Sequence, residues 1–210
     1  MLKFKSSDIS SFSKSTNKNK VYACMAQIAE LPPQIRSSSR NIISCFFFIG
    51  FNACFDFFFK NYMEELYDIL KEKKQIDIET DLYSIELAAF FSDSPARAKA
   101  LNIVQFNGEF GCLHCFHPGE NILSKGNKRI FTNDNYQIKS NEAYLELVEE
   151  AEKLNFPFLG VKKRCILSDF LMIPNQIILD YLHLTFEGVV KRLINIWFEK
   201  FLGKKLNFSL

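Results

Sequence analysis

Residues 83–101 read YSIELAAFFSDSPARAKAL, and the fold prediction rests on the strand, turn and helix that they encode. Tyr83–Phe91 is short, apolar and bounded by polar residues, as expected of a buried strand. Asp93-Ser94-Pro95 ends that strand, because aspartate and serine favour turns and proline cannot continue a strand ladder. A helix is expected to begin over Ala96–Leu101. This order leaves Asp93 at the carboxyl end of a buried strand.

Hydrophobic spacing predicts further elements on both sides of this segment. Val21–Ala29 is expected to be a short strand, and the prolines that follow it start a loop. Apolar residues at helical spacing predict three helices, from Phe55 to about Lys74, from Ser140 or Asn141 through Asn155, and from about Gln176 to Leu202. The buried stripe of the second helix is expected to be Tyr144, Leu147, Ala151 and Leu154. The expected elements thus include both strands and helices.

Two regions between these elements are expected to be irregular. Residues 1–20 are rich in Ser, Lys and Asn, so we expect a disordered or frayed N-terminus, with the folded domain over residues 21–210. Phe110–Gly126 carries glycines and cysteines and is expected to be a loop insertion, followed by a small strand over Gln137–Lys139.

Composition limits the classes of function that the chain can serve. With 210 residues and 48% hydrophobic content, it can bury one sizeable core. A net charge of +2 is too small to indicate a strongly basic nucleic-acid-binding domain. Asn52 and Asp56 interrupt the Phe-rich run from Ile42 to Phe59, so we read that run as core and expect no membrane span.

A metal-ligand pattern occurs in the loop, at Cys112-Leu113-His114-Cys115 with His117 close behind. Two thiolates at this spacing can bind one structural Zn²⁺, and His117, His114 or the distant His183 could complete the site. A single pair of this kind also fits two buried reduced thiols or a redox pair. The six cysteines come without a secretory leader, so a reducing compartment is expected and disulfides are not.

Two acidic positions are candidate functional residues. Asp180 and His183 lie three residues apart and therefore share a helix face, where they could orient each other or bind a metal. A helix-start aspartate beside a satisfied histidine is the alternative interpretation. Asp93 stands where nucleotidyl-transfer folds hold a Mg²⁺-binding carboxylate, although an aspartate that ends a strand is more often a turn former or helix cap.

Basic residues form two compact clusters, which could contact phosphates or could simply be solvated surface. They are Lys162, Lys163 and Arg164, and Lys125, Lys128 and Arg129.

Read in order, several short blocks resemble CACTA (En/Spm)-type DNA transposases, in particular metazoan transposase-domain proteins. The blocks are Phe4-Lys5-Ser6-Ser7, Glu30-Leu31-Pro32-Pro33, Asp93-Ser94-Pro95-Ala96-Arg97-Ala98, Phe106-Asn107-Gly108, the Cys112–Cys115 segment, Asp180-Tyr181-Leu182-His183, Gly188-Val189 and Trp197. They extend over nearly the whole chain. Asn61, at a position where the family has proline, departs from the pattern.

The resemblance implies an α/β fold, namely a partial RNase H-like catalytic core with a mixed sheet, flanking helices and a cysteine-bearing loop insertion. Such a core uses three acids to hold Mg²⁺ for nucleotidyl transfer. Asp93 matches the second acid, Cys112 and Cys115 match an inserted cysteine pair, and Asp180 and His183 match an element whose histidine could complete a metal or structural site. The family's first acid stands before the block that begins at Phe4, and its last acid stands beyond Leu210. Neither therefore has a match in this sequence.

Three functions follow as hypotheses. The first is a transposon-derived remnant that retains the fold, a structural zinc ion and DNA contacts but cannot cleave DNA. The second is an active transposase subunit whose missing acids come from a longer chain or a partner. The third is a zinc-stabilised protein-interaction module. The resemblance implies DNA as partner and a nuclear location, with the cytoplasm as the alternative, and it is compatible with a homo-oligomer.

Overall fold

In the computed structural model, residues 2–9, 20–50, 54–71, 75–78, 81–122, 128–132 and 135–202 are described. Within them the chain is a mixed α/β protein, as the sequence predicts. It divides into two units, Met1–Ile178 and Leu179–Leu210, and each is considered by itself.

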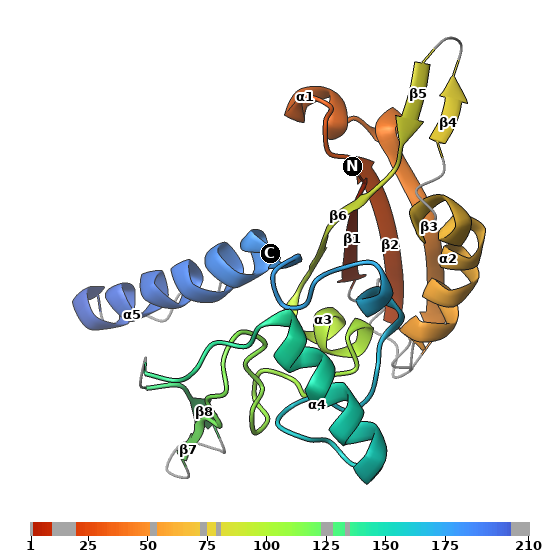
Figure 1. Cartoon of the computed structure of the whole chain (residues 1–210). Helices are drawn as coiled ribbons and strands as arrows, with labels where there is room; N and C mark the ends of the chain where they lie inside the picture. The colour runs from red at the N-terminus through yellow and green to blue at the C-terminus, as the bar shows by residue number, and fades with distance from the viewer. Residues whose placement is uncertain are drawn as a thin grey trace. The chain divides into compact units, whose positions relative to one another are not determined.

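A five-stranded sheet in the order β3-β2-β1-β6-β9 organises the larger unit (Figure 1). The strands are β1 (Leu2–Ile9), β2 (Lys20–Ile28), β3 (Ile42–Gly50), β6 (Leu87–Ser92) and β9 (Ile177–Leu179). β1 pairs antiparallel with β2, and β2 pairs antiparallel with β3. β1 and β6 run parallel. The three N-terminal strands therefore form a meander whose first strand is inserted beside β6.

The strand β1 differs from the expectation of a disordered or frayed N-terminus. Leu2–Ile9 pairs along its full length with β2, from Leu2 opposite Ile28 to Ile9 opposite Val21. Its backbone groups form hydrogen bonds with two neighbouring strands. Local hydrophobic periodicity does not predict such non-local pairing. The expected strand over Val21–Ala29 corresponds to β2.

One helix, α2 (Phe55–Lys71), packs on the sheet and builds the main core (Figure 1). Phe55, Phe59 and Met63 are spaced by one helical turn and are fully or almost fully buried. Phe59 meets Phe46 of β3 at 5.4 Å and Phe90 of β6 at 5.8 Å between ring centroids, both edge to face. The helix predicted from Phe55 is thus confirmed, and its apolar stripe packs against both the edge strand β3 and the inner strand β6.

The Phe-rich run from Ile42 to Phe59 is core only in part. It supplies β3 and the start of α2, and the aromatic rings that face the helix pack against the core. Side chains that point the other way from the edge strand are open to solvent, with Phe47 and Ile49 exposed by 58% and 70%. No helix among the residues described is long and apolar enough to cross a membrane.

The segment predicted as one buried strand over Tyr83–Phe91 is two strands. β5 (Asp81–Ser84) forms a hairpin with β4 (Gln75–Ile78), and β6 begins only at Leu87. Tyr83 is exposed, whereas β6 alternates buried and half-buried residues. Ile85 and Glu86 separate the two strands.

Short helices surround the remaining loops of this unit. They are α1 (Pro33–Arg36), α3 (Ser94–Ala100), α4 (Asn141–Leu154) and the 3-10 helices η1 (Ser39–Asn41) and η3 (Ile166–Asp169). Ser140 caps α4 by accepting a hydrogen bond from the backbone N–H of Ala143 at 3.1 Å. Tyr144, Leu147 and Ala151 are buried as predicted, but Leu154 in the last turn is exposed by 56%.

The insertion between α3 and α4 contains a small hairpin of β7 (Glu120–Ile122) and β8 (Lys128–Ile130) where the sequence predicts a loop. The strand expected over Gln137–Lys139 is reduced to a single bridge between Cys115 and Ile138.

The smaller unit is helical, although not in the way that the sequence predicts. The π-helix η4 (Leu182–Val190) continues into α5 (Lys191–Leu202). The expected helix start near Gln176 is wrong, because Ile177–Leu179 is strand β9. A periodicity of 3.6 residues does not distinguish an α-helix from a π-helical turn inserted into it.

Candidate functional site

Asp93 follows the last residue of β6, as the sequence predicts, and caps the helix after it. Its Oδ1 accepts a hydrogen bond from the backbone N–H of Ala96 at 2.7 Å. Ser94 and Pro95 occupy the first helical turn, where proline is tolerated. The helix-cap alternative is therefore the role that the structure gives this carboxylate.

A second aspartate, Asp8, belongs to the neighbouring strand β1, where the sequence predicts a disordered or frayed N-terminus. β1 and β6 run parallel with Ser6 opposite Ser92. Asp8 is two residues beyond Ser6 along β1, and Asp93 is one residue beyond Ser92 along β6. The parallel register thus brings both backbone positions to the same end of the sheet. Because the sequence does not predict a strand over residues 2–9, it gives no sign that Asp8 and Asp93 lie at the same end of the sheet.

The cysteine loop is fastened to the segment before α4 by backbone hydrogen bonds. The N–H of Phe116 donates to Gln137 O at 3.1 Å, and the N–H of Lys139 donates to His114 O at 2.9 Å. Cys112 and Cys115 are half-buried reduced thiols. Burial, the largest cause, raises the pKa of Cys115. The loop therefore places the two cysteines close enough for the thiol of Cys112 to contribute to the raised pKa of Cys115.

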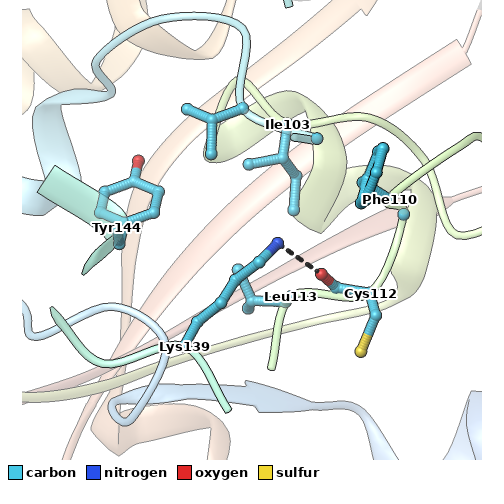
Figure 2. A pocket seen from close by; sticks show the side chains of 9 residues that line it. Ile103, Phe110, Cys112, Leu113, Lys139 and Tyr144 are labelled. Atoms are coloured by element: carbon cyan, nitrogen blue, oxygen red, sulfur yellow. Dashed lines mark hydrogen bonds between the residues drawn. The ribbon is translucent and has the colours of Figure 1, made fainter. Parts of the chain in front are cut away.

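Lys139 is a buried cation at the base of this loop, exposed by only 4%. Its Nζ donates to the carbonyls of Cys112 at 3.0 Å and Leu159 at 3.3 Å. Figure 2 shows the ammonium pointing at the Cys112 carbonyl, while the sulfur of Cys112 points away from it. Burial lowers the pKa of Lys139, and the negative potential of Cys112 and Cys115 opposes that change.

A small cavity lies beside Lys139 (Figure 2). Its volume is about 10 Å³, which suits one water molecule and no larger ligand. The nine residues that line it are Ile103, Phe110, Gly111, Cys112, Leu113, Lys139, Tyr144, Gly160 and Val161. The loop is thus a packed structural element at this point and no substrate pocket.

Arg97, on α3 one turn after Asp93, is a second buried cation and is exposed by 5%. Its Nε has no hydrogen-bond partner within the described residues. Burial lowers the pKa of Arg97, and the nearby Cys112 opposes the change. The pKa of the His114 imidazole is lowered, first by burial and then by the positive charges of Arg97 and Lys139. The thiols consequently sit in an electropositive environment.

His117 is buried immediately after the cysteine pair. Its Nδ1 accepts a hydrogen bond from the N–H of Gly119 at 2.8 Å, and its ring packs on Tyr136 with centroids 4.0 Å apart. The turn requires glycine, since Gly119 has φ +75° and a Cβ there would come within 2.6 Å of Arg129. The Nε2 atom is buried without a partner among the described residues. It is therefore the one histidine nitrogen near the cysteines that is both enclosed and unpaired.

The described residues do not form a preassembled metal site. No group of three or more His, Cys, Asp or Glu residues within them is arranged to hold an ion. Cys112, Cys115 and His117 are close in sequence but do not converge on one point in this arrangement. A zinc ion would have to draw the His117 side chain and the two thiols together.

Asp180 and His183 contact each other, as their spacing predicts. His183 Nδ1 lies 3.1 Å from Asp180 Oδ2, and Asp180 Oδ1 accepts from the N–H of Leu182 at 3.0 Å. Both residues belong to the smaller unit, whose position relative to the cysteine loop is not defined. The prediction that His183 completes a zinc site with Cys112 and Cys115 remains a prediction.

Most of the described members of the two basic clusters are occupied by the protein itself. Lys163 pairs with Asp56 at 2.9 Å, and Arg164 pairs with Asp169. Arg129 donates to the carbonyl oxygens of Pro118 at 2.7 Å and Gly119 at 2.9 Å. Lys125 lies outside the described residues. These contacts favour a structural role for Lys163, Arg164 and Arg129 over phosphate binding.

Comparison with known proteins gives no match to a protein-family model, to a curated protein or to a solved structure.

Proposed function

We propose that the chain is a remnant of the catalytic domain of a CACTA-type transposase, with a partial RNase H-like core, and that it does not cleave DNA on its own. The observation that carries the proposal is the sheet topology around Asp93. Numbered along the chain, the five strands of the sheet follow the order three-two-one-four-five, with the first three antiparallel and the fourth parallel to the first. A mixed sheet with Asp93 directly after one of its inner strands is compatible with the RNase H-like core that the resemblance implies.

The position of Asp93 supports this assignment. It ends the fourth strand of the sheet, next to the first strand, where the resemblance to transposases expects the second acid. Phosphoryl transfer by two metal ions needs several carboxylates that clamp both ions. The resemblance supplies only Asp93, whose Oδ1 is already used to cap α3. A site reduced in this way would lose most of its electrostatic stabilisation of the transition state.

An active enzyme is the second candidate, and Asp8 is the observation that favours it. The register of β1 and β6 brings its backbone to the end of the sheet that carries Asp93. If Asp8 serves as the first acid, only the last acid must come from a longer chain or a partner. Replacement of Asp8 by asparagine would then abolish Mg²⁺-dependent cleavage, whereas a remnant has no such cleavage to lose.

Zinc binding at the cysteine loop is a part of the proposal that can be tested separately. The adjacent thiols of Cys112 and Cys115 and the unpaired Nε2 of His117 support it, with His183 or His114 as other ligands. Neutral histidine and thiolate are the ligands that Zn²⁺ prefers. The buried cations Arg97 and Lys139 weigh in the opposite direction, because they repel a divalent ion while stabilising thiolates. Two reduced thiols in a zinc-free loop are therefore the alternative.

If zinc binds and cleavage is absent, the chain could also act as a zinc-stabilised protein-interaction module. DNA binding, a homo-oligomer and a nuclear or cytoplasmic location rest on the resemblance alone. The ion pairs of Lys163 and Arg164 weaken the case for DNA contacts at that cluster.

One experiment separates these functions. Metal content and Mg²⁺- or Mn²⁺-dependent cleavage of plasmid DNA are measured on the same preparations of wild type, Asp93→Ala and Cys112→Ala, with Cys54→Ala as the control for an exposed thiol. We expect one zinc ion per chain in wild type, Asp93→Ala and Cys54→Ala, none in Cys112→Ala, and no cleavage by any of them. Cleavage that depends on Asp93 would favour the active enzyme.

A further inference from the structure

We propose that Cys24 and Cys45 form a thiol pair that a hydroperoxide converts into a disulfide, with Cys45 as the attacking thiol and Cys24 as the resolving thiol. The pair lies in the sheet, apart from the cysteine loop, and the inference does not depend on the proposed function. It is carried by the pairing of β2 with β3 and by the side chains that surround Cys45.

A β-bulge brings the two cysteines together. Cys24 of β2 pairs with Phe46 of β3, but the next pair joins Met25 to Ser44, so Cys45 is an extra residue with no partner of its own. A bulge re-aims side chains that would otherwise alternate between the two faces of a sheet. Cys45 and Phe46, although consecutive, both pack against the core cluster that contains Cys24. The cysteine side chains therefore share one face of two neighbouring strands.

The two thiols affect each other's ionisation and are not equivalent. Cys24 is completely buried, and a hydrogen bond with Cys45 followed by burial raises its pKa well above the ordinary value. The same hydrogen bond, accepted by the sulfur of Cys45, lowers the pKa of Cys45. Burial raises that pKa, and a hydrogen bond from the Tyr62 hydroxyl of α2 lowers it further. Cys45 is half-buried and belongs to an edge strand, so a small oxidant has access to it. In its protonated form it makes only a weak contact with Ile43 O at 3.8 Å.

These differences assign the roles in the reaction, because the thiolate is the nucleophile. The Cys45 thiolate attacks one oxygen of a hydroperoxide such as H2O2, the O–O bond breaks, and hydroxide leaves, which gives Cys45 sulfenic acid. The sulfur of Cys24 then attacks the sulfur of Cys45, a disulfide bond forms, and the sulfenic oxygen leaves as hydroxide. The protons of the two thiols convert both hydroxides into water. Two thiols are oxidised, and one peroxide is reduced.

The test uses the full chain, reduced and freed of reductant, then treated with one equivalent of H2O2. Remaining thiols are alkylated, and the linked peptides are identified by mass spectrometry with and without dithiothreitol. We expect a Cys24–Cys45 link in wild type that dithiothreitol reverses. In Cys24→Ala the reaction should stop at Cys45 sulfenic acid, which a 1,3-diketone probe labels. In Cys45→Ala, Cys24 should stay reduced because it is buried.

A matched pair of tyrosine variants tests the activation of Cys45. Tyr62→Phe should slow the formation of the disulfide about tenfold, since one hydrogen bond to a thiolate changes its population by about that factor. Tyr67→Phe removes a hydroxyl from the same helix and should leave the rate unchanged. Wild-type oxidation confined to the exposed Cys54 or to Cys112 and Cys115 would overturn the proposal. So would oxidation of Cys24 in the Cys45→Ala variant.

Discussion

The contact between the sheet and α2 is almost entirely apolar, whereas the cysteine loop is held by hydrogen bonds of buried polar side chains. In the first region, Phe46 of β3 and Phe90 of β6 pack edge to face on Phe59 of α2. In the second, Lys139 donates to two carbonyls and His117 accepts from a turn N–H. Apolar burial tolerates small shifts in geometry, but a buried cation is stable only while its acceptors are in place. The sheet should therefore set the global stability and the loop the local one.

The largest effect expected from this comparison is in the aromatic core. Phe59→Ala removes a fully buried ring and should lower the free energy of unfolding by about 3–5 kcal/mol. Phe57→Ala, which truncates a ring exposed by 58% on the same helix, should change it by less than about 0.5 kcal/mol. Urea unfolding measured by circular dichroism compares the two. Similar losses for both variants would mean that α2 does not pack on the sheet as described.

A smaller and more local effect is expected in the loop. Lys139→Met keeps the length of the side chain but leaves the carbonyls of Cys112 and Leu159 unpaired, which should cost about 2–3 kcal/mol. Amide hydrogen exchange should accelerate around the loop and stay unchanged in β2 and β6. An unchanged loop would contradict the idea that Lys139 holds it.

The cap of α3 should contribute less to the free energy of unfolding than either of the two regions. Asp93→Ala removes the acceptor for the N–H of Ala96 and should destabilise the protein by about 1 kcal/mol. Asp93→Asn retains a capping oxygen and should cost only a few tenths of that. Thermal unfolding distinguishes them, and a gain in stability on removal of the carboxylate would show that it is held against repulsion by other charges.

The smallest effect concerns the acid side of the pH profile. Hydrogen bonds from its own backbone N–H and from the Ser140 hydroxyl hold the pKa of Glu142 below its usual value. A depressed carboxylate pKa stabilises the folded state above the unfolded-state pKa of about 4.5, and that contribution is lost as the pH falls further. Glu142→Gln should flatten the dependence of stability on pH between about 5 and 3. An unaltered slope in equilibrium unfolding would argue against the contact.

The elements that the sequence predicts well are those whose signal is local. α2 and α4 repeat apolar residues each turn and have capping or charged residues at their ends. Asp93 marks the end of β6 and the start of α3. β1 was missed because its order comes from pairing with β2 and β6, across many residues of chain. The same holds for its residue Asp8. The π-helical turn η4 and the exposure of Leu154 also depend on packing that no local pattern records.

The same distinction between local and non-local signals applies to the residues of the candidate site. The spacing of Asp180 and His183 predicts a contact that the structure contains, whereas a metal site at Cys112 and Cys115 stays a prediction. The buried cations beside the cysteines were missed, because Arg97 and Lys139 come from elements on either side of the loop and a charged residue is expected at the surface. The contact of Cys24 with Cys45 depends on a bulge, which sequence periodicity hides.

The most direct test of the proposed function is cleavage of supercoiled plasmid DNA in Mn²⁺ by wild type and Asp93→Ala, with both preparations shown to be folded by circular dichroism. The account predicts the same background nicking for the two proteins, because the resemblance matches only one of the three metal-binding carboxylates to a residue of this sequence. Cleavage by wild type that disappears in Asp93→Ala would contradict it and would identify the chain as an active nuclease.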